Sequence, residues 1–463
     1  MVRPMATAAR RVLDLRFIVL VNIAAIFSLR SLTEVARLGW GALTMTAIAF
    51  AIFFVPLTLA VVALSARYPE EGGLYRWTQT AFGPTHGFVC GWAYFVNNLV
   101  FFPQVLTHVA VLLPWVVTGR AGDQGRLYVV AVGLAGLWGL GVLPNVLGAR
   151  RTGQASAAGV IGSMIGVAVL AGLAVVAAVR GAASATPTST WLPSVGGSDL
   201  AMLSSLPFLF AGLELAPTMG DEVKDARRTL VRGALIAGAL LTLMFFAGLT
   251  AIVLALRPEE IGLADGIPAA VAALSARIGA PAVLVQLIAA CLVLAAIGQV
   301  VVWMAGSARL VRAAGVDRAM PAWFTREHPR LGTPVEGLVA QGVAASLLLL
   351  ASVAGSSVGE AYAVLRSVTQ VVYYLPFLYL FASHVRLAPP ELRGRAWLVG
   401  GVGFVTTLLG VAAAVVPPRE VTDLLLFEIK VIGGAALLVV AGLPLYLTAR
   451  RGDDKGKTRS YAT

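Results

Sequence analysis

The chain has 463 residues, of which 58% are hydrophobic and only 13% are charged. Soluble domains carry roughly 25% charged residues, so this composition excludes an ordinary soluble protein and indicates a bundle of membrane-spanning helices. The net charge of +12 would suit a nucleic-acid partner, but the basic residues follow the loops of a membrane topology, so we expect no nucleic acid to bind.

Twelve segments are long and apolar enough to cross a bilayer, for which a helix needs roughly 20 residues. We therefore expect an all-α polytopic membrane protein in contact with the lipid bilayer. In chain order the predicted spans cover residues 15–35, 40–66, 84–117, 127–147, 154–179, 200–223, 230–256, 280–311, 335–353, 362–385, 396–416 and 424–448.

The distribution of basic residues orients this bundle, because cytoplasmic loops carry an excess of Lys and Arg. With the N-terminus inside, most of the 35 Lys and Arg residues fall in the two termini and in the loops after even-numbered spans. This pattern predicts cytoplasmic N- and C-termini and a multi-pass protein of the cell inner membrane. Nothing in the sequence indicates an oligomeric state.

Two of the predicted spans are flawed in matching ways. The first carries Arg30 and Glu34 where an apolar run should continue, and the sixth carries Gly212, Glu214 and Pro217. Gly and Pro interrupt a helix, and hydrocarbon cannot satisfy the backbone groups that a break releases. Paired broken helices in corresponding halves of a chain indicate the central site of a transporter.

The remaining segments predict scaffold. An aromatic-rich stretch over residues 68–83 is typical of a helix at the cytoplasmic interface. Residues 258–279 form either a re-entrant or capping helix over the entry or an ordinary surface loop. Neither a zinc-spaced Cys/His set nor a phosphate-binding loop nor a Ser-His-Asp arrangement is present. We therefore expect no enzyme activity, no cofactor and no metal.

Several motifs resemble the amino acid-polyamine-organocation superfamily, the amino acid permeases of the LeuT-like fold. The resemblance lies in four features: EEGGLYRW at 70–77 with AFGP at 81–84, FAGLE at 210–214 with DEVKDARR at 221–228, WMAGSAR at 303–309 with GTP at 332–334, and the twelve-span plan. Among subfamilies, the chain looks most like the bacterial glutamate/γ-aminobutyrate antiporters.

This resemblance implies two five-helix repeats of inverted orientation whose first helices, 1 and 6, are broken. The implied organisation is a cytoplasmic N-terminal segment, the first repeat, an extracellular loop, the second repeat, helices 11 and 12, and a disordered cytoplasmic tail. Their residues are 1–14, 15–180, 181–199, 200–386, 387–450 and 451–463.

The resemblance also implies a substrate site between the two breaks and a facing wall from helices 8 and 10. In the helix-8 and helix-10 motifs, Gln299 stands where the antiporters have Glu, and Phe377 stands where they have a second Tyr. The implied substrate-binding residues are Ser28, Arg30, Ser31, Phe210, Ala211, Gly212, Gln299, Trp303, Tyr373 and Phe377.

The roles of the two charged residues at the breaks are open. Arg30 pairs with Glu34, pairs with Glu214, contacts substrate or takes part in coupling, and Glu214 is a candidate proton carrier. We expect a secondary active transporter that moves amino acids by alternating access, as an antiporter or a proton-coupled symporter. A polyamine or organic-cation carrier and a non-transporting amino-acid sensor are the alternatives.

Overall fold

A computed structural model of the chain describes residues 11–122, 125–182, 191, 204–257, 261, 266–316, 319–326, 328–329, 331–353, 358–417, 421 and 423–448. Within these residues the regular structure is helical. One isolated β-bridge joins Leu13 to Val223, so the segment before the first helix pairs with the end of the sixth predicted span.

The first half of the chain forms helices whose bounds lie close to the predicted ones. Two of its spans contain a π-helical turn, η1 or η2. The elements are α1 (Leu15–Ile26), α2 (Leu29–Ala36), α3 (Gly41–Ala49), η1 (Phe50–Phe54), α4 (Val55–Arg67), α5 (Leu74–Phe82), α6 (Pro84–Thr118), α7 (Arg126–Gly136), η2 (Leu137–Val142), α8 (Leu143–Val146) and α9 (Ala149–Val179).

The second half contains the shorter helical pieces as well as long spans. Its elements are α11 (Ser205–Leu209), η5 (Ala216–Glu222), α12 (Ala226–Ala255), α13 (Gly266–Ile278), α14 (Val283–Val316), η7 (Ala322–Thr325), α15 (Val335–Val353), α16 (Val358–Arg386), η8 (Pro390–Leu392), α17 (Arg393–Val415) and α18 (Leu424–Val440).

Eleven helices in the described part of the chain are long and apolar enough to cross a membrane. Each coincides with a predicted span. The remaining predicted span, residues 200–223, is divided into α11 and η5 by a non-helical stretch, so the predicted break accounts for the difference between eleven and twelve. Residues 200–203 lie outside the described part.

The two loops that we singled out both contain helices. Residues 74–82 form α5, as expected for the aromatic-rich stretch. Between α12 and α14, residues 266–278 form α13, which packs against α14. A helix is therefore present where the sequence allowed either a capping helix or an ordinary loop.

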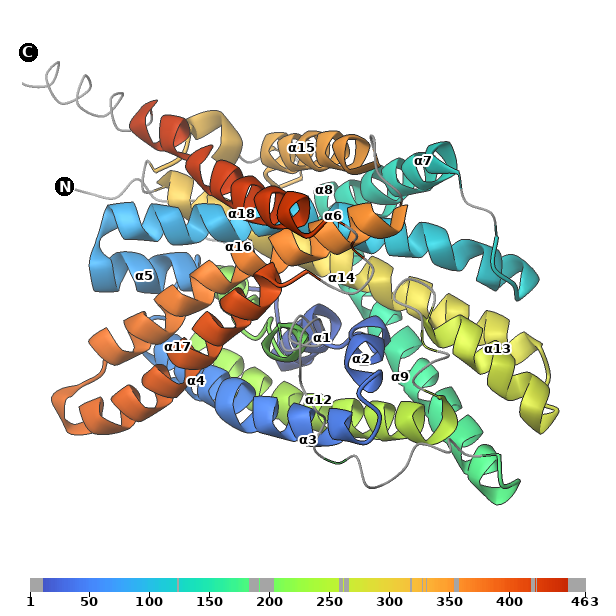
Figure 1. Cartoon of the computed structure of the whole chain (residues 1–463). Helices are drawn as coiled ribbons and strands as arrows, with labels where there is room; N and C mark the ends of the chain where they lie inside the picture. The colour runs from blue at the N-terminus through green and yellow to red at the C-terminus, as the bar shows by residue number, and fades with distance from the viewer. Residues whose placement is uncertain are drawn as a thin grey trace, which may run out of the picture.

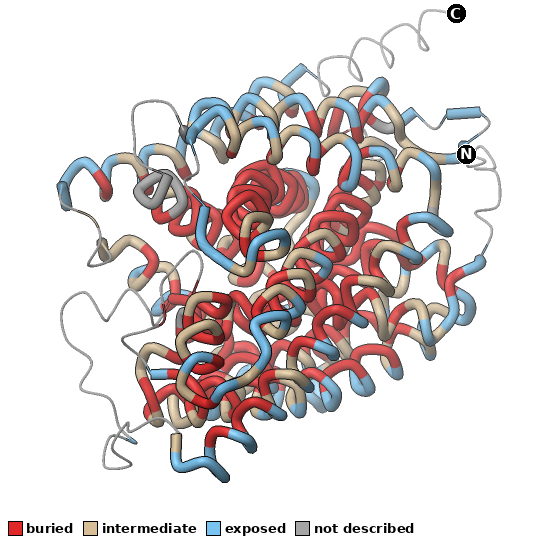
Figure 2. Tube along the Cα trace, turned by 90° about the vertical axis from the view of Figure 1, so that its right-hand side faces the viewer, coloured by how far each residue is buried: buried red, intermediate tan, exposed pale blue. Residues whose placement is uncertain are grey.

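The broken helices occupy the middle of the bundle. Figure 1 shows α1 and α2 near the centre, with α12 and α3 on one side and α14 and α16 on the other. Figure 2 shows that buried residues concentrate in the inner helices while the outer helices alternate between buried and exposed positions. An apolar outer surface is what a helix bundle needs where lipid surrounds it.

Small residues allow the long helices α9 and α14 to approach closely. A Cβ atom on Gly159 would lie 2.7 Å from the Cα atom of Gly298, and one on Gly162 would lie 2.9 Å from the Cβ atom of Leu294. Backbone contact of this kind is the usual basis of helix association in membranes. It holds α9 against α14, the helix that carries Gln299 and Trp303.

Candidate substrate site

The first break lies between α1 and α2. The α-helix ends at Ile26, Ser28 has an extended backbone (φ −144°, ψ 121°), and α2 begins at Leu29. Ser28 and Arg30 are buried, and Ser31 is partly buried in the first turn of α2. All three predicted residues therefore lie at the break.

The second break lies between α11 and η5. Gly212 has φ +133°, which L-residues with side chains rarely adopt. A Cβ atom there would also lie 2.7 Å from the Ile26 side chain. Only glycine fits, and this close approach brings the two breaks into contact at the centre of the bundle.

Glu214 is fully buried beside this contact. Its carboxylate accepts hydrogen bonds from the Tyr373 hydroxyl at 2.5 Å, the Gly212 amide at 3.0 Å and the Tyr94 hydroxyl at 3.3 Å. Within the described residues no basic side chain pairs with it, so the predicted alternative of an Arg30–Glu214 ion pair is wrong. The other alternative, pairing with Glu34, involves a side chain outside the described part.

Trp303 joins the scaffold to the first break. Its indole N–H donates a hydrogen bond of 3.0 Å to the carbonyl of Ala25, in the last turn of α1. The indole ring lies 5.4 Å from the ring of Tyr373 and 5.8 Å from that of Tyr94. Tyr373 also packs against Phe377, with ring centroids 4.8 Å apart. These aromatic rings form a wall beside the Glu214 carboxylate.

The structure thus brings together Gly212, Glu214, Trp303, Tyr373 and Phe377. Three other predicted residues, Phe210, Ala211 and Gln299, have different surroundings.

Phe210 packs its ring against Phe54 and Phe245, with centroids 5.1 Å and 4.9 Å away, and Ala211 is buried beside it. Gln299 is buried one helical turn before Trp303, but no hydrogen bond joins it to Glu214 in the described structure.

Sequence reasoning missed Tyr94, which lies in the long, unbroken helix α6. A signal was present in the sequence. Tyr94, Asn98, Phe101, Gln104 and His108 recur at three- and four-residue spacing, which places polar side chains on one face of an apolar span. Polar residues within a span generally face the bundle interior or a cavity.

A sequence model of the family described as "Amino acid permease" matches residues 14–428. The chain belongs to this family. The permease is a secondary transporter embedded in a membrane, not an enzyme.

Individual proteins agree with this assignment. The permease is 27% identical to an uncharacterized transporter of Legionella pneumophila, over 96% of this chain and 98% of that protein. It is 23% identical to a probable agmatine/putrescine antiporter of Lactococcus lactis, over 71% and 69%. A manganese transporter of Eremococcus coleocola has 14% identity and a TM-score of 0.59 over 97% and 96% of the two chains. That likeness shows the LeuT-like fold.

One end of the permease's central site is closed by a set of contacts that we call the α5 closure. It comprises the loop before α5, η5 and the last turns of α14. The Gly72 amide donates to the Thr218 carbonyl at 3.3 Å. A Cβ atom on Gly220 would lie 2.0 Å from the Pro69 carbonyl oxygen, so backbone meets backbone here.

Two ion pairs complete the α5 closure. Arg312 donates to Glu71, with Nε 2.9 Å from Oε1, and Arg309 donates to Glu222, with Nε 2.5 Å from Oε1. Burial raises the pKa of the Glu71 carboxyl even though Arg312 opposes the shift. Burial acts in the same direction on Glu222, but the charge and hydrogen bond of Arg309, together with the charge of Arg312, outweigh it and hold the pKa of that carboxyl below its usual value.

The opposite end of the site is closed by the α11 closure, which joins α11 to α16. The Ser204 hydroxyl bonds to the Gln370 side-chain oxygen at 2.9 Å, and the Gln370 amide lies 3.4 Å from the Ser205 hydroxyl. Arg366 also donates to Ser205, and the Tyr374 hydroxyl donates to the Ser204 carbonyl. The α5 closure and the α11 closure thus involve the two halves of the broken sixth span, η5 and α11.

Proposed function

We propose that the permease carries amino acids or closely related amines and that Glu214 binds their ammonium group. The main support for this proposal is a fully buried carboxylate at a helix break, which accepts hydrogen bonds from two tyrosine hydroxyls and a backbone amide. A charge removed from water is costly unless it is compensated. Because no basic side chain of the described residues compensates Glu214, a substrate cation or a proton is the natural counter-charge.

The aromatic wall supports an ammonium in this position. The rings of Trp303, Tyr373 and Tyr94 lie within 6.0 Å of one another around the carboxylate. Aromatic faces attract organic cations, and the attraction strengthens where water is excluded. A carboxylate combined with such rings therefore favours a primary ammonium over an anionic substrate.

The carboxylate of an amino acid fits the start of α2. Amides at the N-terminus of a broken half-helix bind anionic groups in transporters of this kind. Ser28 lies at that N-terminus, and Gly212 brings the neighbouring break to within contact of α1. We propose that Ser28, Arg30 and Ser31 surround the substrate carboxylate, and that Phe210, Ala211, Gly212, Gln299 and Phe377 complete the binding site.

A diamine is the second candidate substrate, because a probable agmatine/putrescine antiporter is among the relatives. Two ammonium groups call for two acceptors, whereas Glu214 and Glu71 are the buried acids of the described residues and Glu71 pairs with Arg312 in the α5 closure. One unpaired buried acid fits one ammonium. This observation favours an amino acid.

Coupling follows if one carboxylate serves both cations. A proton and a substrate ammonium compete for Glu214, so binding of one releases the other. The α5 and α11 closures would then open alternately as the broken helices move against the scaffold, within the two repeats over residues 15–180 and 200–386. The basic loops support placing both termini and the α5 closure on the cytoplasmic side of the inner membrane.

Exchange and uptake in proteoliposomes test this function. We would measure transport of labelled amino acids, agmatine and putrescine at two pH values by the wild type and by Glu214→Gln. Loss of a buried charge partner costs roughly 2–5 kcal/mol, so we expect uptake by the variant to fall at least about thirtyfold. Tyr373→Phe should have a smaller effect, and Tyr94→Phe the smallest, in the order of their distances to Glu214.

The exposed acid Glu391 provides a matched control. Glu391→Gln removes the same charge away from the site and should leave transport unchanged. Wild-type uptake by Glu214→Gln would refute the proposed site. Transport of putrescine but of no amino acid would replace the favoured substrate class with the second one.

A further inference from the structure

A groove opens on the outer surface where α16 ends and α17 begins. Its volume is about 710 Å³, and Phe82, the last residue of α5, also lines it. Figure 1 shows α17 running beside α16, with α5 at the same end of the bundle. The residues that matter for its chemistry are Phe82, Arg386, Arg393, Trp397, Gly401 and Phe404.

Two arginines give this groove its charge. Arg386 is the last residue of α16 and Arg393 the first of α17, and both are exposed. Arg386 places its guanidinium 5.2 Å from the centre of the Phe82 ring. In the described structure neither arginine pairs with a carboxylate, so two positive charges face a shared cavity without an acid to balance them.

The rest of the groove is apolar. Gly400 allows α17 to lie against α16, because a Cβ atom there would be 2.4 Å from a methyl group of Val385. The next residue is Gly401. A Cβ atom there would have no neighbouring atom within 4 Å, so the groove stays open at this point. Trp397 is 63% exposed at its edge, as is common for tryptophan at a membrane interface.

The arginines and the apolar surface lie at different depths. One candidate span ends at Arg386 and the next begins at Pro390, so Arg386 and Arg393 lie at the membrane boundary. Gly401 and Phe404 lie two to three turns further along α17, within the span. Positive charge at the boundary above an apolar groove matches the shape and charge of one kind of molecule, a lipid with an anionic headgroup.

We propose that this groove binds an anionic phospholipid, with its phosphate on Arg386 and Arg393 and an acyl chain along Gly401 and Phe404. Basic pockets between membrane helices are suited to such headgroups, and guanidinium binds phosphate through two parallel hydrogen bonds. The lipid fills a site that takes no part in holding the transported substrate.

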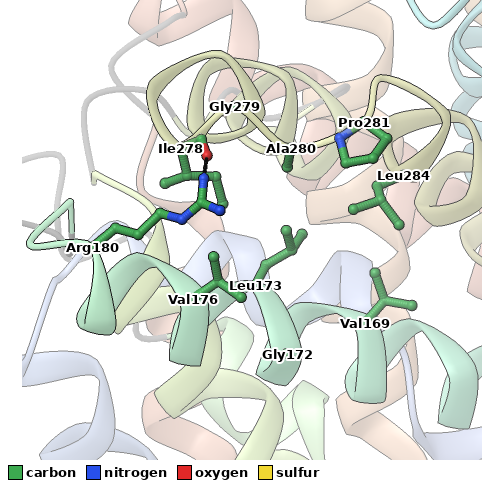
Figure 3. A pocket seen from close by; sticks show the side chains of 10 residues that line it. All are labelled: Val169, Gly172, Leu173, Val176, Arg180, Ile278, Gly279, Ala280, Pro281 and Leu284. Atoms are coloured by element: carbon green, nitrogen blue, oxygen red, sulfur yellow. Dashed lines mark hydrogen bonds between the residues drawn. The ribbon is translucent and has the colours of Figure 1, made fainter.

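A second groove provides a comparison, because its arginine is bonded within the protein. It lies between α9 and the loop from α13 to α14, has a volume of about 410 Å³ and is also lined by apolar side chains and one arginine. Figure 3 shows that the Arg180 guanidinium turns to the Ile278 carbonyl, to which it donates a hydrogen bond. The Arg180 guanidinium is therefore bonded within the protein and does not present its charge to a ligand in the groove.

Native mass spectrometry of the purified full-length permease tests the proposal. The probes are phosphatidylglycerol and phosphatidylcholine of the same acyl chains, added in equal amounts. Each basic residue near an anionic lipid contributes about 1 kcal/mol, so two arginines predict that phosphatidylglycerol is preferred by roughly thirtyfold. The variant R386Q/R393Q should lose this preference while still binding phosphatidylcholine, whereas R395Q, an exposed arginine that does not line the groove, should keep it.

A substitution that fills the groove tests the acyl-chain contact separately from the headgroup contact. Gly401→Leu should lower the occupancy of both lipids at least about fivefold, because its side chain enters the space where the acyl chain lies. Gly433→Leu, at an equally open glycine of α18, is the matched control.

Unchanged phosphatidylglycerol preference in R386Q/R393Q would overturn the proposal, and so would an equal loss in R395Q. Full displacement of the lipid by inorganic phosphate would show a phosphate site instead.

Discussion

The two closures of the central site differ in what holds them together. The α5 closure joins three parts of the chain through backbone contacts and two ion pairs. The α11 closure joins α11 to α16 through hydrogen bonds of hydroxyl, amide and carbonyl groups and of the Arg366 guanidinium, and none of these bonds ends on a carboxylate. Breaking an ion pair leaves two charges to be hydrated, while breaking a hydroxyl hydrogen bond exposes neutral groups. The neutral hydroxyl and amide bonds of the α11 closure are therefore individually less costly to break than the ion pairs of the α5 closure.

The largest effect on the α5 closure is expected from a substitution at Gly220. Gly220→Ala places a Cβ atom 2.0 Å from the Pro69 carbonyl oxygen, which the α5 closure cannot accommodate. We expect closing to cost at least about 3 kcal/mol and transport to fall roughly a hundredfold. Uptake into proteoliposomes gives the rate, and labelling of a cysteine introduced at Thr218, which is fully buried, reports opening.

The labelling requires replacement of the two native cysteines, Cys90 and Cys291, which are buried. Gly172→Ala is the control, because a Cβ atom at Gly172 would have no neighbouring atom within 4 Å. Wild-type transport by Gly220→Ala would show that the α5 closure is not needed in the cycle.

Removing an arginine should weaken the α5 closure less severely. Arg312→Gln leaves Glu71 without its partner in a site where the Glu71 side chain is only 7% exposed. Because the Arg312 side chain is 21% exposed, we expect a loss of about 2 kcal/mol, below the value for fully buried pairs. Arg309→Gln should cost less, since the Glu222 side chain is 19% exposed. Thermal unfolding and Thr218→Cys labelling check this order, and a larger effect at Arg309 would contradict it.

Acid should act on the two pairs in opposite directions. The pKa of Glu71 in the α5 closure is raised above 4.5, so acidification through that raised pKa favours closing. The pKa of Glu222 is lowered below 4.5, so its contribution is present above 4.5 and is lost as the pH falls through the lowered pKa. We therefore expect Glu222→Gln to abolish opening in strong acid and Glu71→Gln to enhance it.

A pH series of Thr218→Cys labelling from about 7 to about 3 measures both effects. Identical profiles for the two variants would show that the ion pairs do not respond separately.

The smallest effect is expected at the α11 closure. Tyr374→Phe removes the hydroxyl that donates to the Ser204 carbonyl, and a neutral hydrogen bond contributes about 1 kcal/mol. Substrate affinity should change less than about tenfold, with the thermal unfolding temperature nearly unchanged. An effect as large as that of Arg312→Gln would remove the proposed difference between the two closures.

The sequence was sufficient to predict the features that depend on neighbouring residues. Apolar length predicted the spans, and Gly212 with Pro217 predicted the broken helix in which Glu214 lies. The four-residue spacing of Gln299 and Trp303 and of Tyr373 and Phe377 placed each pair on one helix face.

The contacts between distant segments could not be predicted in the same way. Arg312 and Glu71 are 241 residues apart, and Arg309 and Glu222 are 87 apart. From the sequence these arginines served only to orient the bundle, because a basic residue at a helix end has the same local pattern whether or not it pairs. Tyr94 was missed for a related reason, since its partner Glu214 lies on another helix.

The bond between Trp303 and Ala25 has a consequence for synthesis of the chain in the membrane. The break after α1 releases a carbonyl whose observed partner is 278 residues later. At roughly 5–20 residues per second, that partner is made about fifteen seconds to one minute after Ala25. Hydrocarbon cannot satisfy the carbonyl in the meantime, so the first helix must remain hydrated, or held by the insertion machinery, until α14 arrives.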